Sequence, residues 1–267
     1  SIGIAMYPEH GENLQELLMH ADIAMLASKE QGRNTYSVFS YNIDQYEERH
    51  QSKLINDLFK AIDEDQFVLF YQPKFNKYRK ICGVEALIRW QHPKLGLLGP
   101  NMFIPLAEKE GMIERITDYV VEEVFNDLGY FLSAHPQLYI SINLSASDFH
   151  SSRLIALIND KNREYSVAAL QIKVEVTERG FIDVHKMTPV IQAFRKAGYE
   201  VAFDDFGTGY SNLHNLSALN IDILKIDKSF ISTLSTNSTS HLIAEHIIEM
   251  AQSLHLKMIA EGVETVE

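Results

Sequence analysis

The sequence predicts an α/β protein built on a (β/α) barrel, and the order of its apolar segments supports this fold class. Seven apolar runs of strand length follow one another between residues 67 and 262, with amphipathic helical patterns between most of them. Strands that alternate with helices form a parallel sheet. Seven such strands in roughly 200 residues favour a barrel over an open sheet.

A short α+β segment precedes the expected barrel. Residues 1–8 predict a strand, and residues 13–32 predict an amphipathic helix that stops at Gly32. Residues 33–40 predict a second short strand. The polar stretch at 41–66 has widely spaced apolar residues, so we expect a linker that passes into a helix.

The elements of the barrel follow in order along the chain. We expect strands at residues 67–73, 83–90, 138–145, 170–178, 200–206, 223–227 and 257–262. The clearest helices lie at 118–133, 188–198 and 240–254. The last helix repeats apolar residues at helical spacing, namely Ile243, Ile247, Met250 and Leu254.

Charge and composition exclude several classes of protein. The formal net charge is −12, so non-specific binding to a nucleic-acid polymer is not expected. A small anionic ligand is still compatible with this charge, provided that bound cations invert the local field. The single cysteine, Cys82, allows no internal disulfide, which fits a reducing cytoplasm.

The chain carries no targeting signal that we recognise. No apolar run approaches the length needed to span a bilayer, and no signal peptide is visible. Because the sequence starts at Ser1 in mid-pattern, we expect a segment of a longer protein. We expect a cytoplasmic location, and a membrane anchor of the parent protein would lie outside this segment.

Two adjacent carboxylates at the end of one expected strand raise a physical problem. Asp204 and Asp205 follow an apolar run and precede Gly207 and Gly209, although like charges repel and are costly to bury. Neighbouring side chains on a strand point to opposite faces, so both can serve one site only if the backbone turns there. Glycines permit such a turn, and we therefore expect a strand end that holds a metal.

The other strand ends supply matching polar residues, namely Gln72, Glu85, Asn143, Glu175, Glu178, Asp227, Glu261 and Glu264. Each alone has an ordinary interpretation as a surface residue, a turn former or a helix cap. Together they are hard oxygen ligands at the edge of a barrel where active sites lie. Such a set is typical of Mg²⁺ or Mn²⁺ and does not suit zinc.

Two cationic residues stand among these acids, and each has two interpretations. Lys225 either neutralises the carboxylates or holds a nucleophilic water as a positioned donor or base, and the two roles are compatible. Arg89 follows Glu85 by four residues. Its planar guanidinium suits a phosphate, whereas the ordinary interpretation is a solvent-facing residue beside Trp90.

Six motifs together resemble a known family. EALIRW (85–90), NLS (143–145), EVTE (175–178), DDFGTGYS (204–211), LKID (224–227) and AEGVET (260–265) are similar, in order and approximate spacing, to the motifs of EAL-domain cyclic di-GMP phosphodiesterases. Agreement of six linked motifs by chance is improbable.

The start of the chain resembles the C-terminal end of a GGDEF domain. The similarity lies in residues 1–8 and 20–34, although Leu26 stands where that family usually has Tyr. The signature loop and catalytic carboxylates of a GGDEF domain are absent from these residues, so we expect no synthesis of cyclic di-GMP by them. This interpretation divides the chain into a GGDEF remnant at 1–40, a linker at 41–50 and an EAL domain at 51–267.

The EAL resemblance implies a fold and a reaction. It implies a TIM-like (β/α)8 barrel with one antiparallel strand, here truncated before its eighth strand. It implies hydrolysis of one phosphodiester bond of cyclic di-GMP to give linear pGpG. It also implies two ions of Mg²⁺ or Mn²⁺, and we expect Ca²⁺ to inhibit because its looser geometry blocks the in-line arrangement.

The same resemblance assigns residues to roles. It implies that one ion is held by Glu85, Asn143, Glu175 and Asp204, and a second by Asp204, Asp205 and Glu261. Lys225 would act on the water between the ions, with Glu261 and Glu178 as further catalytic residues. Glu178 would order the loop after Asp205 and tie the site to a dimer interface. Gln72, Leu87 and Arg89 would contact the dinucleotide.

Three functions remain open from the sequence. The first is a metal-dependent phosphodiesterase acting as a homodimer through the barrel, with GGDEF or sensory domains upstream. The second is a receptor that binds cyclic di-GMP without cutting it, but all the candidate metal ligands are present, which favours the enzyme. The third is a protein-interaction module, which would not need so many acids at strand ends.

Overall fold

The protein is described here by a computed structural model covering residues 1–30, 34–40, 44–150, 152–177, 184–206, 219–231 and 238–263. The chain forms two compact units. The first comprises residues 1–68 and 88–113, and the second comprises residues 69–87 and 114–267.

The first unit begins with the expected α+β segment. β1 (Ile2–Ile4) pairs in parallel with β2 (Tyr36–Val38), and α1 (Leu14–Glu30) packs on both strands. The same unit contains α2 (Asp44–Ala61), which packs against α3 (Pro100–Lys109). α2 starts within the stretch expected to be a linker, and the proposed domain boundaries remain a prediction.

Aromatic side chains form the core of the first unit around Trp90. Its indole ring is fully buried and packs against the rings of Phe67 and Phe103. Burial of the indole N–H is made possible by Gln66, whose Oε1 accepts its hydrogen bond at 2.9 Å. A short strand that the sequence analysis did not identify, β5 (Gly96–Leu98), pairs antiparallel with the end of the strand that carries Trp90.

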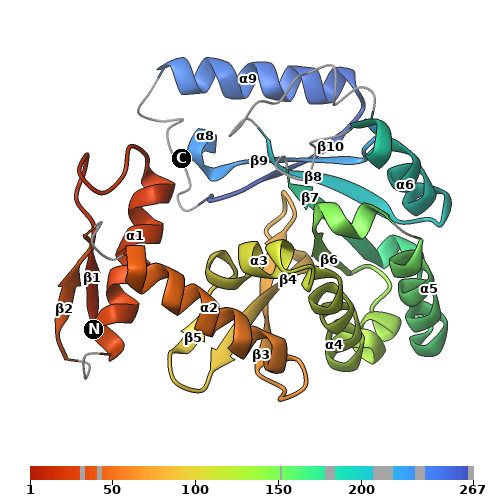
Figure 1. Ribbon diagram of the computed structural model, residues 1–267. Helices are drawn as coiled ribbons and strands as arrows, with labels where there is room; N and C mark the ends of the chain where they lie inside the picture. The colour runs from red at the N-terminus through yellow and green to blue at the C-terminus, as the bar shows by residue number, and fades with distance from the viewer. Residues whose placement is uncertain are drawn as a thin grey trace. The chain divides into compact units, whose positions relative to one another are not determined.

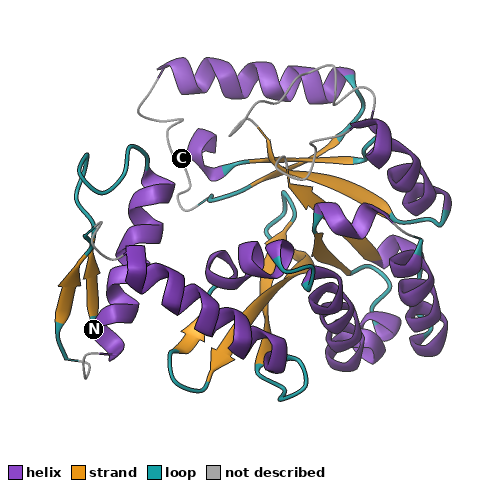
Figure 2. Cartoon of the chain, viewed as in Figure 1, coloured by secondary structure: helices purple, strands orange, loops and turns teal. Residues whose placement is uncertain are grey.

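One curled sheet contains all seven strands predicted for the barrel, in the order β10-β9-β8-β7-β6-β4-β3 (Figures 1 and 2). Their bounds are β3 (Phe67–Phe75), β4 (Ile81–His92), β6 (Tyr139–Leu144), β7 (Ile172–Thr177), β8 (Glu200–Phe206), β9 (Ile223–Ile226) and β10 (Lys257–Ala260). Neighbouring strands from β4 to β10 are parallel. β3 and β4 are joined by only five residues, so this pair runs antiparallel, as expected.

Helices of the second unit line the outer side of this sheet (Figure 1). They are α4 (Ile113–Ala134), α5 (Arg153–Tyr165), α6 (Val184–Lys196) and α9 (Ser238–Ser253), with short helical turns η2 (Ala146–His150), η3 (Ala169–Gln171) and α8 (Lys228–Ile231). The outward strand residues Ile140, Val174 and Val201 are fully buried. The helices thus cover an apolar face, while the opposite face of the sheet carries the polar residues.

Strand register decides which residues share the polar face. Glu85 lies opposite Ser141, Asn143 opposite Glu175, and Thr177 opposite Asp204. Because side chains alternate along each strand, alternate positions on all these strands point to the same side of the sheet. The register therefore brings acids that are distant in sequence to one side of the sheet.

The pairing of β8 with β9 shifts between Phe203 and Phe206, at the Asp204–Asp205 pair. An irregularity of this kind bends a strand and re-aims its side chains. From the sequence we expected the strand to end and the backbone to turn at this pair, whereas β8 continues through it to Phe206 with a shift of pairing. The glycines thought to cause it, Gly207 and Gly209, lie outside the described residues, as does the side chain of Asp205.

Gly83 allows β4 and β6 to approach closely just before Glu85. A Cβ atom at this position would lie 2.6 Å from the carbonyl oxygen of Tyr139 and 2.7 Å from its ring. We expect Gly83→Ala to lower the free energy of unfolding by about 1–3 kcal/mol, the usual cost of overpacking. Urea unfolding checks this against Lys80→Ala, which changes an exposed residue of the same hairpin, and equal stabilities would contradict it.

Asp148 ties the turn after β6 to α4. Its Oδ2 accepts hydrogen bonds from the backbone N–H and hydroxyl of Ser145, both at 2.8 Å, and from the hydroxyl of Thr117 at 2.9 Å. Burial raises the pKa of Asp148 more than these hydrogen bonds lower it. The folded protein therefore holds the Asp148 proton more tightly than the unfolded chain does.

A raised folded pKa means that Asp148 contributes stability below the unfolded pKa of about 3.9, and that this contribution is lost as the pH rises through the folded pKa. Asp148→Asn keeps an acceptor oxygen and does not ionise. We expect the variant to gain stability relative to the wild type between pH 4 and pH 7, as measured by urea unfolding at each pH. A stability difference that does not change with pH would refute this.

Candidate metal centre

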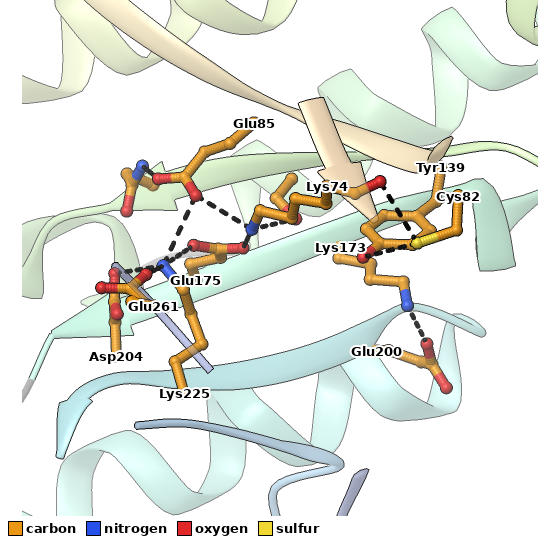
Figure 3. A network of polar contacts seen from close by, with 12 residues as sticks. Lys74, Cys82, Glu85, Tyr139, Lys173, Glu175, Glu200, Asp204, Lys225 and Glu261 are labelled. Atoms are coloured by element: carbon orange, nitrogen blue, oxygen red, sulfur yellow. Dashed lines mark hydrogen bonds and ion pairs between the residues drawn. The ribbon is translucent and has the colours of Figure 1, made fainter. Parts of the chain in front are cut away.

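The site is organised around the ammonium group of Lys225, which projects from β9 into the polar side of the sheet. Its Nζ lies 2.6 Å from Glu175 Oε2, 2.7 Å from Asp204 Oδ2 and 2.8 Å from Glu261 Oε1, with Glu85 Oε2 at 3.5 Å (Figure 3). The Lys225 side chain is 1% exposed. Four carboxylates, which lie on β4, β7 and β8 and directly after β10, therefore share one buried cation.

A second lysine, Lys74 on β3, reaches two of these carboxylates from the other side (Figure 3). Its Nζ lies 2.5 Å from Glu175 Oε1 and 2.9 Å from Glu85 Oε2, and it donates to Ser141 Oγ at 3.2 Å. Its side chain is 11% exposed. Glu175 thus uses one oxygen for each lysine.

Glu85, Glu175 and Asp204 form the part of this cluster that can hold a metal ion. One oxygen from each lies within 4.8 Å of the others. Asn143 adjoins them, since its Nδ2 donates to Glu85 Oε1 at 3.0 Å. These four residues come from β4, β6, β7 and β8, which are consecutive neighbours in the sheet.

Burial and charge act against one another in this cluster. Burial would raise the pKa of Glu85, but the ammonium groups of Lys225 and Lys74 outweigh it and lower that pKa below its ordinary value. Burial raises the pKa of Asp204 to about 6, and the nearby Glu175 and Glu261 oppose the lowering effect of Lys225. Burial would lower the pKa of Lys225, but its four carboxylate partners raise it above its ordinary value. Lys225 is therefore charged at neutral pH.

The donor set fits a hard divalent cation. Every candidate ligand offers oxygen, and the carboxylates already surround a positive charge, which the ammonium of Lys225 supplies in the metal-free protein. The described side chains of the cluster comprise four carboxylates and two lysines, which leaves two negative charges uncompensated. The charge of one divalent ion would balance this excess.

The structure brings together six of the residues expected from the sequence, namely Glu85, Asn143, Glu175, Asp204, Lys225 and Glu261. Gln72 is exposed on β3, and Leu87 is half-buried on β4. Arg89 belongs to the first compact unit, where its Nη1 donates to the carbonyl oxygen of Ile88. Glu178 and the side chain of Asp205 lie outside the described residues, so their roles remain predictions.

Lys74 was missed from the sequence because the expected strand ended at Pro73. The strand continues to Phe75 on the edge of the sheet, where a proline costs no ladder hydrogen bond. Gln72 was recognised, and residues two apart on a strand share a face. This spacing is the signal that could have identified Lys74.

Comparison with known proteins places this arrangement in a family. The chain matches the EAL domain over residues 55–267 and the diguanylate cyclase GGDEF domain over residues 1–35. The chain belongs to the EAL domain family, and a short piece of a GGDEF domain precedes that domain.

Two curated bacterial relatives show how far the similarity extends. The cyclic di-GMP phosphodiesterase NbdA of Pseudomonas aeruginosa is 38% identical over 99% of this chain, which covers 34% of NbdA. The probable cyclic di-GMP phosphodiesterase PdeB of Escherichia coli is 44% identical over 77% of this chain, which covers 39% of PdeB. The chain thus spans little more than a third of the length of these relatives.

A solved structure agrees with the fold. The PaMucR phosphodiesterase in complex with c-di-GMP is 36% identical and superposes with a TM-score of 0.73, covering 80% of this chain and 88% of that one. This likeness confirms the predicted TIM-barrel-like class. Among the described residues, no helix is both long and apolar enough to cross a membrane.

Proposed function

We propose that this chain hydrolyses one phosphodiester bond of cyclic di-GMP to give linear pGpG, as part of a larger bacterial signalling protein. The observation that carries the proposal is the group of four carboxylates, from four strands or directly after them, gathered around a position held by the Lys225 ammonium. The relatives named as cyclic di-GMP phosphodiesterases and the c-di-GMP complex of a solved relative support this substrate.

The proposed metal ligands follow the arrangement of the strands. Glu85, Asn143, Glu175 and Asp204 would hold one ion of Mg²⁺ or Mn²⁺, and Asp204, Asp205 and Glu261 would hold a second. Bound at such a site, these ions stabilise the charge of the phosphodiester and lower the pKa of water. A dianionic substrate and a cluster with excess negative charge would otherwise repel each other.

The side chains of the protein itself are proposed to hold the substrate in place and to donate protons. Lys225 Nζ lies among the four carboxylates in the absence of metal. When metal ions take over these acids, the ammonium is proposed to be left beside the ions as a donor to the reacting phosphodiester or to the attacking water. Gln72, Leu87 and Arg89 are proposed to contact the dinucleotide, with the Arg89 guanidinium on a phosphate. Glu178 is proposed to order the loop after Asp205.

Association and context form a further part of the proposal. We propose a homodimer through the barrel, because the role assigned to Glu178 couples the active site to such an interface. The GGDEF match over residues 1–35 supports further GGDEF or sensory domains upstream in the parent protein. We also propose that the domain works in the cytoplasm, which agrees with its single cysteine, Cys82.

The proposed activity is tested by incubating the protein with cyclic di-GMP and either Mg²⁺ or Mn²⁺, followed by chromatography of the products. Linear pGpG is expected, whereas a parallel reaction with Ca²⁺ should yield none. Tight binding of cyclic di-GMP without product would show that the protein is a receptor for this nucleotide and not an enzyme. Absence of both binding and product would leave only the interaction module.

Glu85→Gln should abolish turnover, because it removes a charged ligand and changes little volume. The product assay measures this against Glu122→Gln, which makes the same change at an exposed position of α4. Turnover close to that of the wild type in Glu85→Gln would show that Glu85 is not a metal ligand.

Lys225→Ala separates the catalytic role of this lysine from a neutralising one. If Lys225 positions a proton or a water, the catalytic rate should fall ~10²–10⁴-fold, with much less change in substrate binding. If it only neutralises the carboxylates, the metal-free variant should lose thermal stability, Mg²⁺ should restore it, and turnover should persist. We expect both the loss of rate and the loss of metal-free stability. Normal turnover would exclude the catalytic role.

A further inference from the structure

The ammonium group of Lys74 has a full set of hydrogen-bond acceptors within the site. An ammonium group has three hydrogens, and Lys74 Nζ has three acceptors at 2.5, 2.9 and 3.2 Å, on Glu175, Glu85 and Ser141. The Ser141 hydroxyl is not a candidate metal ligand. Lys74 therefore has an anchor that does not depend on the carboxylates.

The two lysines use different oxygens of Glu175. Lys74 lies against Oε1 and Lys225 lies against Oε2. A cation that replaced Lys225 among the acids could take Oε2 while Lys74 kept Oε1. Asp204 and Glu261, in contrast, are paired with Lys225. Glu85 contacts both lysines through Oε2, at 2.9 Å from Lys74 and 3.5 Å from Lys225. The acids that contact Lys225 and not Lys74 mark the side on which a metal ion would replace an ammonium group, and Lys74 lies against the other side of Glu175.

We propose that Lys74 is a permanent counter-ion and positioning residue of the metal centre: it fixes Glu85 and Glu175 from the β3 side and limits how tightly divalent cations bind before the substrate arrives. This inference rests on the proposed function. It assigns different tasks to two lysines that share Glu85 and Glu175: Lys225 yields its carboxylate partners to the ions, and Lys74 keeps its own.

The net charge of the cluster explains why Lys74 would limit the affinity for divalent cations in the absence of substrate. With both lysines in place, the two excess negative charges of the described cluster are balanced by a single divalent ion. A second ion adds positive charge that an anionic phosphodiester can offset. Lys74 thereby makes full loading with metal favourable when the substrate is present.

Removal of Lys74 has two opposing effects on metal affinity. It loosens Glu85 and Glu175, which weakens binding, and it removes a positive charge, which strengthens binding. Loss of a partner in the outer shell of a metal site commonly weakens metal binding 10–100-fold by loosening the ligand. Here the ligands have other support, because Asn143 still holds Glu85 and the Glu175 side chain is fully buried. The lost charge has no such replacement, since Lys74 is one of two lysines facing four carboxylates. We therefore expect charge to dominate.

The test compares Lys74→Met, Lys74→Arg and Lys80→Met by calorimetric titration with Mn²⁺ in the absence of cyclic di-GMP. Lys74→Met should bind Mn²⁺ about tenfold more tightly than the wild type and should lose melting temperature only when metal-free. Lys74→Arg keeps the charge and should bind Mn²⁺ like the wild type. Lys80→Met removes an exposed charge from the same hairpin and serves as the control.

The outcomes are distinct. Unchanged or weaker Mn²⁺ binding in Lys74→Met would overturn the inference, because a purely structural role loosens the ligands without raising affinity. If Lys74→Met does not fold, Mn²⁺ binding by Lys74→Arg decides, and a change beyond threefold overturns the inference. A wild-type protein that binds no Mn²⁺ overturns both this inference and the proposed metal site. Mn²⁺ binding without hydrolysis of cyclic di-GMP overturns the proposed function alone.

Discussion

The rest of the site depends on one interaction, the contact of the Lys225 ammonium group with four carboxylates. Parallel strands bring their carboxyl ends to one edge, so acids placed there must approach one another whatever their separation in sequence. Buried carboxylates without a cation would be protonated or would disrupt the sheet. Lys225 contacts all four carboxylates of the cluster, and this contact keeps them together in the absence of a metal ion.

The apolar strands and the acidic strand ends were predictable for different reasons. Strands such as Ile172–Thr177 and Ile223–Ile226 are short runs rich in apolar residues, which is the pattern that predicts a buried strand. Each ends next to an expected polar residue. Burial of one face leaves few alternative registers, because a slip of one residue would expose the apolar set. The curled parallel sheet and the meeting of Glu85, Glu175 and Asp204 follow from this restriction.

Other features depend on contacts that a single sequence does not reveal. The short strand Gly96–Leu98 exists because it pairs with β4, and its three residues carry no periodic signal. The apolar face expected for the helix at 240–254 includes Ile243 and Leu254, which are 42% and 40% exposed, whereas the small residues Ala244 and Ala251 of α9 are buried. Hydrophobicity alone predicts burial for the larger residues. A helix that lies close to a sheet instead places its small residues at the contact. The side chain of Asp205 lies beyond the described residues, so its predicted role is untested.

The register shift in β8 has a consequence for how this sequence can vary. A strand that keeps its pairing tolerates no insertion or deletion, because every later side chain would exchange the apolar face for the polar one. In β8 the irregularity lies at Asp204 and Asp205, at the candidate metal centre. Loss of one residue there could restore regular pairing and keep the fold, while leaving a single carboxylate in place of two. Such a deletion would leave one carboxylate where the proposed metal site has two. Under the proposed function, a change in length at this point would therefore be a direct route from hydrolysis of the substrate to binding alone.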